Sequence, residues 1–441
     1  MQLLVISLIQ SAAAMNCGTS GQLDALAGRG TPLDHARLER PAFIHGPEPH
    51  RPPPPDRSVY GTSWPDHVET EHFTIQWWDD SVSPGAVTAA AEALEVGWQA
   101  FVEEQGWQAP VSSDTYYIWV LLDPALGSTT GYTTEYFDAT YPDGLPVIYL
   151  NPTTLDDFGP AFYHALTVHE LMHAIQFGMR PYDWEADNHN LENWYWEASA
   201  THASELADPS IDGHQYTSAW YADRPEQRYD SYDSSHQYGM FVFNAWLDHH
   251  LGAGSMRQVW AQSSSRQSTP WPSIMEETTG WSAEALWAGF TDAYGNGTLP
   301  ENPLYTQPKN QGALEDGAGG RLDELGTHYW TLDGDWTVTP DSGAVILGGT
   351  TEAGAPLRSG GSRVVTVTAL ADGTDYTLSL SEPTQDPDDS GTPANDSGTP
   401  PSGGTLPANT HKGGCATVGT GTAFLAWAGL AALGCRRRPR V

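Results

Sequence analysis

The spacing of apolar residues in the first third of the chain predicts strands alternating with a helix. Residues 72–78 alternate apolar and polar side chains, and residues 116–122 and 147–150 are short apolar runs, so each predicts a β-strand. Across 84–105 apolar residues recur every three or four positions, which predicts an amphipathic helix opening at Pro84. These elements favour a small sheet covered by helices.

A longer helical pattern covers residues 160–179, with Pro160 suited to its first turn and Gly178 to its end. Apart from His169, Glu170 and His173, residues 166–175 are uncharged and mostly apolar, so most of this helix is expected to be buried. A second helix is expected around residues 193–205.

Residues 208–235 are polar and aromatic, and predict a long loop that lines or covers a cleft. Further helices are predicted at about 235–251, 255–262 and 282–294, which would form an α-helical second lobe. We expect the cleft between this lobe and the lobe that contains the sheet.

The pattern changes again after about residue 300, where glycine and aspartate increase and short apolar runs appear. Runs at 328–332, 344–347, 363–370 and 376–380 predict a small β-sandwich-like domain over residues 320–382. The whole chain is therefore expected to be an α+β protein.

The two ends differ in composition from the body. Residues 1–14 are typical of a secretory signal peptide, although no basic residue precedes the apolar run, and 15–57 of a linker or propeptide. Residues 383–414 repeat Asp-Ser-Gly-Thr-Pro and predict a disordered stalk. Within 415–441, an apolar stretch ends in an arginine cluster, which predicts a membrane span or sorting tail with its arginines on the cytoplasmic side.

Candidate chemistry centres on His169, Glu170 and His173, which form an H-E-x-x-H pattern in the helix over 160–179. Side chains four residues apart share one helical face, so both imidazoles can reach one metal ion. Glu170 lies beside them, where it can accept a proton from a metal-bound water.

Two histidines leave a catalytic zinc one protein ligand short. Glu197 follows in the next helix, with the small residues Ala200, Thr201 and Ser204 on its face, so that face can approach the first helix closely. Three other side chains remain competing ligands: Glu192, His202 and Glu205.

Other H-E-x-x-H proteins use ligands that this chain lacks. The metzincin pattern needs glycine and histidine where the chain has Gln176 and Met179, and peptide deformylases need a cysteine ligand. The three cysteines, Cys17, Cys415 and Cys435, all lie near the ends, so the folded body has neither a thiolate ligand nor a disulfide framework.

The H-E-x-x-H pattern followed by Trp194-Tyr195-Trp196-Glu197 and Ala200 resembles the gluzincin metallopeptidases, especially secreted bacterial ones with W-x-E-x-x-A in the second helix. The resemblance covers about residues 58–295, within an expected catalytic domain over residues 58–299. It implies a zincin-like fold, zinc held by His169, His173 and Glu197, and Glu170 as general base. Thermolysin-type gluzincins carry an aspartate where this chain has Thr201, so the partner of the first histidine is unassigned.

Two further expectations follow from the zinc peptidase hypothesis. Strand 147–150 is the candidate for the cleft edge that pairs with an extended substrate, with an internal position as the alternative. Such an enzyme also needs a donor to the oxyanion of the attacked carbonyl, and Tyr238 or His236, at the start of the next helix, could supply one. The C-terminal tail resembles the MYXO-CTERM sorting signals of myxobacterial surface proteins, which implies export and surface attachment.

Charge limits the range of partners. With 55 acidic and 19 basic residues, the net charge of −36 disfavours binding to nucleic acid or to an anionic membrane surface. It suits an extracellular protein and would tolerate Ca²⁺, for which the sequence indicates no location. We therefore predict a secreted or surface-anchored zinc metallopeptidase acting on proteins or peptides. An inactive zincin-like adhesion protein and a zinc amidase acting on cell-wall amides are the alternatives.

Overall fold

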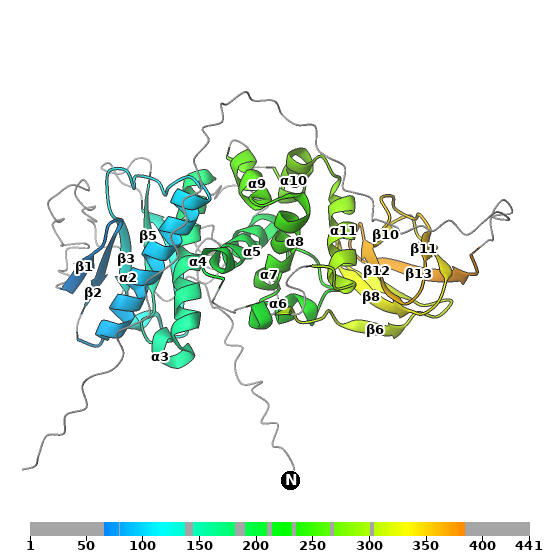
Figure 1. Cartoon of the computed structure of the whole chain (residues 1–441), viewed down its shortest axis with the longest axis horizontal. Helices are drawn as coiled ribbons and strands as arrows, with labels where there is room; N and C mark the ends of the chain where they lie inside the picture. Colours follow the sequence, from blue (N-terminus) through cyan, green and yellow to red (C-terminus); the bar gives the residue numbers. More distant parts are fainter. Residues whose placement is uncertain are drawn as a thin grey trace, which may run out of the picture. The chain divides into compact units, whose positions relative to one another are not determined.

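The computed structural model describes residues 66–383, apart from residue 79 and the segments 137–143, 181–189, 210–213, 232–234, 265–268 and 300–303. The predicted signal peptide, linker, stalk and sorting tail all lie outside the described residues. Within them, no helix has both the length and the apolar character needed to cross a bilayer. The described part mixes helices and sheets and is of the α+β class (Figure 1).

A five-stranded sheet opens the fold, in the order β1-β2-β3-β5-β4. Its strands are β1 (Asp66–Glu69), β2 (Phe73–Trp77), β3 (Ile118–Leu122), β4 (Gly131–Tyr136) and β5 (Leu145–Leu150). The central strands β2, β3 and β5 run parallel, and β1 and β4 are antiparallel edges. Both faces of β3 and β5 are buried, which accounts for their continuous apolar sequences.

The prediction that residues 147–150 border the cleft is wrong, because β5 is internal and pairs with β3 and β4. The edge strand is β4, which the apolar pattern did not predict. Its sequence, Gly-Tyr-Thr-Thr-Glu-Tyr, has no aliphatic residue. Its buried positions are filled by Tyr132, Thr133 and Glu135, so no aliphatic run marked it as a strand.

Alternate side chains of the central strands enter two different cores. On one face, Ile118, Val120 and Ile148 join a large cluster with helices α2 (Pro84–Trp98) and α4 (Pro160–Met179). On the other face, residues such as Trp119 and Tyr149 form a smaller cluster. Helix α2 continues beyond Trp98 as a π-helical turn, η2 (Gln99–Glu104). Short elements η3 (Pro124–Leu126) and α3 (Thr154–Phe158) complete this lobe.

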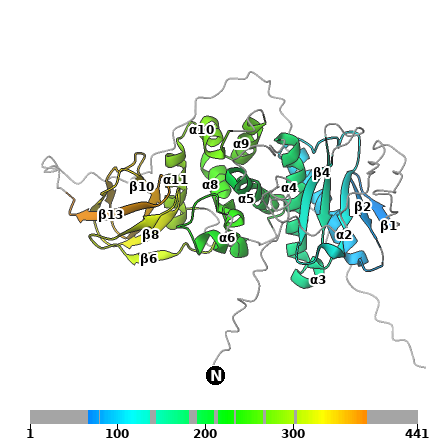
Figure 2. The ribbon, with the colours of Figure 1, turned by 180° about the vertical axis from the view of Figure 1, so that it is seen from behind.

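Helix α4 lies between the sheet and α5 (Asn190–Ala207), as both views show (Figures 1 and 2). The described part of the second lobe contains further helices, several of which contact α5. They are α6 (His214–Ala222), α7 (His236–Gly239), α8 (Phe241–Leu251), α9 (Ser255–Ser263), α10 (Trp271–Thr279) and α11 (Ala283–Gly295).

The predicted helical lobe is present, with three differences in detail. Residues 208–235 are not one loop, because α6 lies within them. The helix expected over 235–251 is divided between α7 and α8 at Met240. Helix α10 was not predicted. It begins at Trp271, and Pro272 lies in its first turn, where proline is well tolerated.

The C-terminal strands form two four-stranded sheets, β10-β12-β8-β6 and β11-β9-β13-β7, around their own apolar cluster. The predicted runs correspond to β8 (Thr327–Leu332), β10 (Val345–Leu347), β12 (Arg363–Ala369) and β13 (Thr374–Ser381). The strands not predicted are short and rich in polar or glycine residues: β6 (Asn310–Ala313), β7 (Gly319–Leu322), β9 (Trp336–Pro340) and β11 (Leu357–Ser359).

The two C-terminal sheets contact the helical lobe mainly where β12 packs against α11. Asp292 of α11 forms an ion pair with Arg363, and Asn296 bonds both the backbone N–H (2.9 Å) and the carbonyl (3.0 Å) of Val364. The described residues accordingly belong to one compact unit.

Candidate metal centre

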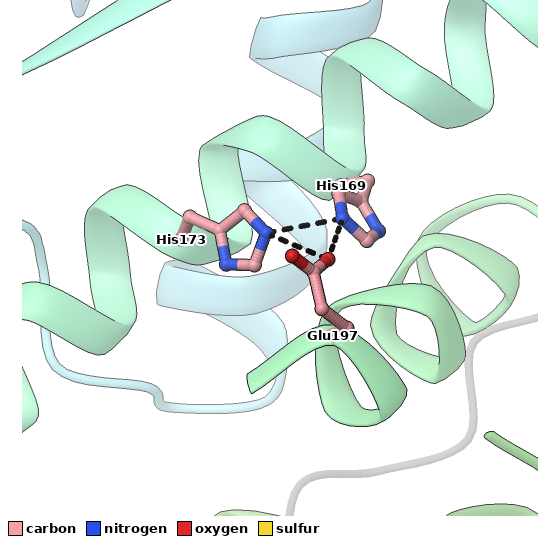
Figure 3. Close-up of side chains that lie close together, drawn as sticks. All are labelled: His169, His173 and Glu197. Carbon is pink, nitrogen blue, oxygen red and sulfur yellow. Dashed lines mark hydrogen bonds and ion pairs between the residues drawn. The ribbon is translucent and has the colours of Figure 1, made fainter. Parts of the chain in front are cut away.

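Two histidines of α4 point toward one another inside the protein. His169 and His173 are one helical turn apart on the face that meets α5, and both are fully buried. Their Nε2 atoms lie 3.1 Å apart, and the rings are perpendicular (Figure 3). Burial of two imidazoles with their nitrogens face to face requires a shared proton or cation between them.

Glu197 of α5 completes the group from the facing helix. Its Oε2 lies 3.1 Å from His169 Nε2 and 3.4 Å from His173 Nε2, so the three ligand atoms form a nearly equilateral triangle. Tetrahedral zinc with bonds of about 2.0–2.1 Å separates its ligand atoms by about 3.3 Å. The triangle therefore has the dimensions of a metal site. Within the described residues, it is the one such group of histidine, cysteine or acidic side chains.

Electrostatics at the site also favour a carboxylate facing the imidazoles. Burial raises the pKa of Glu197, but the facing imidazoles of His173 and His169 outweigh burial and hold the pKa well below its usual range. Burial lowers the pKa of His173, but Glu197, together with Glu170 and Gln176, outweighs that effect, so the pKa is raised. The carboxylate thus stays ionised, the form in which it can bind a cation.

Glu170 is positioned from the sheet. Thr133 of the edge strand β4 donates its hydroxyl to Glu170 Oε2 (2.8 Å) or to the Glu170 carbonyl (2.9 Å). A Cβ on Gly131 of the same strand would lie 3.2 Å from Glu170 Oε1, so glycine leaves room for this carboxylate. Burial raises the pKa of Glu170, against the lowering effect of His173, His169 and Thr133.

Each histidine has a side-chain neighbour at its other ring nitrogen. Gln176 Oε1 lies 2.7 Å from His173 Nδ1, and Thr201 Oγ1 lies 3.5 Å from His169 Nδ1. Thr201 is thus the side chain that lies beside the outer nitrogen of His169, whose partner the sequence left unassigned. The sequence analysis did not identify the contact between Gln176 and His173. Residues three apart are neighbours on a helix surface, so this spacing could have indicated it.

Of the two candidate oxyanion donors, one lies beside the triangle. The ring of Tyr238 is 6.1 Å from that of His169, centre to centre, and is almost completely buried. His236 is fully buried, and its ring lies 5.5 Å from that of Tyr221 of α6. Tyr238 therefore contacts a residue of the triangle, whereas the ring contact of His236 is with α6.

Two of the competing ligands, His202 and Glu205, do not join the triangle. His202 Nε2 lies 3.3 Å from Asp248 of α8, and both residues line a separate cavity of about 550 Å³ that includes none of the three ligands. Glu205 is buried two turns further along α5 than Glu197, and the side chain of Glu192 is outside the described set.

Comparison with known protein families found no family model that matches the chain, and comparison with curated proteins found no match. Any functional conclusion therefore depends on the site itself.

Proposed function

We propose that the chain is a zinc-dependent peptidase of the gluzincin type, with His169, His173 and Glu197 as zinc ligands. The triangle of ligand atoms with sides of 3.1, 3.1 and 3.4 Å is the observation that carries the proposal. Two imidazole nitrogens and one carboxylate oxygen are one of the ligand sets of catalytic zinc sites, which keep a fourth position for water. Zinc is therefore favoured over harder cations such as Ca²⁺ or Mg²⁺, which prefer oxygen ligands.

Zinc bound here would act as a Lewis acid and lower the pKa of its water from ~15.7 toward ~7. Glu170 would accept a proton from the attacking water and pass it to the leaving amine. Thr133 holds one oxygen of this carboxylate, which restricts how the carboxylate can turn. Tyr238 would donate its hydroxyl to the oxyanion of the attacked carbonyl.

The edge strand β4 is the proposed contact for the substrate backbone. Among the described strands it pairs with β5 alone, and it carries Thr133, which contacts Glu170. An extended peptide that added to this edge would pass close to the general base. This assignment replaces residues 147–150, and it favours peptides over compact amide substrates.

Export and surface attachment are part of the proposal. They depend on the composition of residues 1–14 and 415–441. The excess of acidic residues in the body suits an extracellular protein and disfavours nucleic acid as a partner.

The test is proteolysis of casein by the purified, zinc-loaded protein and by Glu170→Gln. Loss of the general base should lower the rate by about 10²–10⁴-fold while zinc stays bound, because Glu170 is not a ligand. Glu205→Gln is the matched control, and it should keep both activity and zinc. A Glu170→Gln protein as active as wild type would refute the assigned role, and zinc binding without hydrolysis of any peptide would favour the binding protein or the amidase.

A further inference from the structure

The side-chain amide of Gln176 connects the two helices that carry the metal ligands. From α4, its Nε2 donates to the carbonyl of Trp196 (3.1 Å) and to Ser199 Oγ (2.9 Å), both on α5. Its Oε1 lies 2.7 Å from His173 Nδ1. Gln176, His173 and Ser199 are all fully buried, so water does not compete for these bonds.

The partners of this amide leave it one orientation. A backbone carbonyl can only accept a hydrogen bond, so the NH₂ group must face Trp196, and the amide oxygen must face His173. The hydroxyl of Ser199 is also committed: it donates to the Tyr195 carbonyl and accepts from the indole N–H of Trp260 (3.0 Å). Ser199 Oγ therefore accepts a hydrogen bond from the second N–H of the Gln176 amide and does not donate to the amide oxygen.

The orientation of the amide determines which nitrogen of His173 carries the proton. Because Gln176 Oε1 can only accept, His173 Nδ1 must donate, and a neutral ring then has its lone pair on Nε2. Nε2 is the atom that faces His169 and Glu197 in the triangle. The network thus presents His173 in the one tautomer that can bind a metal through Nε2.

We propose that Gln176 is a positioning residue for the metal centre, which fixes the tautomer and ring orientation of His173 and ties α4 to α5 beside Glu197. This inference rests on the proposed metal site. The two histidines are held unequally, because the hydroxyl of Thr201 lies 3.5 Å from His169 Nδ1 and can turn to donate or accept. Gln176 therefore contributes more to metal affinity than Thr201.

The first experiment measures zinc dissociation constants by competition with a chromophoric chelator for wild type, Gln176→Met and Thr201→Val. Methionine has a similar length to glutamine but offers His173 only a weakly accepting sulfur. Loss of a hydrogen-bond partner to a ligating histidine weakens metal binding by about 10–100-fold, and we expect that loss for Gln176→Met and a smaller one for Thr201→Val. Equal affinity of wild type and Gln176→Met would overturn the proposal.

A role in packing alone would predict a different set of results, so two further measurements accompany the first. Gln176→Glu keeps an acceptor for His173 and loses the donors to α5, and it should bind zinc more tightly than Gln176→Met. In metal-free wild-type protein labelled with ¹⁵N-histidine, the ring of His173 should show the proton on Nδ1 when neutral, and Gln176→Met should show a mixture of tautomers. A neutral wild-type ring with its single proton on Nε2 would contradict the inference even if the variants fail to fold.

Failure of the metal site and failure of the Gln176 inference give different results. If wild type binds no zinc, the proposed function fails. If wild type binds zinc and Gln176→Met binds it equally well, the role of Gln176 alone is refuted.

Discussion

His236 should make the stability of the folded protein depend on pH. It lies fully buried at the start of α7, with its ring against Tyr221 and with Arg224 among the charges that act on it. Burial, reinforced by the positive charge of Arg224, lowers its pKa from 6.5 to about 4. The folded protein therefore keeps this imidazole neutral over a range of pH in which the unfolded chain protonates it.

The sign follows from proton linkage. Above pH 6.5 both states are neutral, and the histidine adds no pH dependence. As the pH falls from 6.5 toward 4, the unfolded chain binds a proton at His236 that the folded state does not bind, so the free energy of unfolding decreases. At 1.36 kcal/mol for each unit between the two pKa values, the loss is about 3 kcal/mol by about pH 4. That is a large share of the ~5–15 kcal/mol stability of a typical domain.

The assay is urea unfolding of wild type and His236→Gln at several values between about pH 7.5 and about pH 4. Substitution by glutamine changes stability by an amount that does not vary with pH, and all other titrating groups cancel in the difference. The advantage of wild type over the variant should therefore shrink by about 3 kcal/mol across this range. A difference that stays constant would show that His236 titrates normally, and the reasoning would be wrong.

Two further predictions concern the base and the contact between α11 and β12. Gly131→Ala should lower kcat by about tenfold with zinc affinity unchanged, because the added Cβ would lie 3.2 Å from Glu170 Oε1 and 3.1 Å from the Tyr149 carbonyl and would displace the base. Steady-state kinetics beside a zinc titration checks this, and an unchanged kcat would contradict it. Arg363→Met should reduce the free energy of unfolding by about 1–3 kcal/mol, because it leaves the half-buried Asp292 without its cation. Urea unfolding of the two proteins measures this, and equal midpoints would show that the ion pair adds no stability.

Helical periodicity was sufficient to locate the helices that carry the candidate ligands. In α4, apolar residues around the motif predicted a buried helix, and spacing placed His169 and His173 on one face. The small residues beside Glu197 predicted the close approach of α5, and the structure brings the carboxylate to both imidazoles. These are local rules of spacing and size, which the sequence expresses directly.

Contacts between distant segments were not predictable in the same way. Strand β4 has no aliphatic residue, so no apolar run indicated that Thr133 and Gly131 would lie against Glu170. The choice between Tyr238 and His236 also depended on how α7 packs, since both lie in the same short turn of helix. Helix propensity does not distinguish glutamine from other helix formers at position 176, and the hydrogen bonds of Gln176 to α5 became apparent only in the structure.

The most direct test of the central claim is the zinc content of the purified protein, measured by elemental analysis after reconstitution and dialysis. We predict about one zinc per chain for wild type and for Glu205→Ala, and loss of zinc for Glu197→Ala, because Glu197 supplies the third corner of the triangle. Absence of zinc from wild type, or full retention by Glu197→Ala, would contradict the assignment of this metal centre.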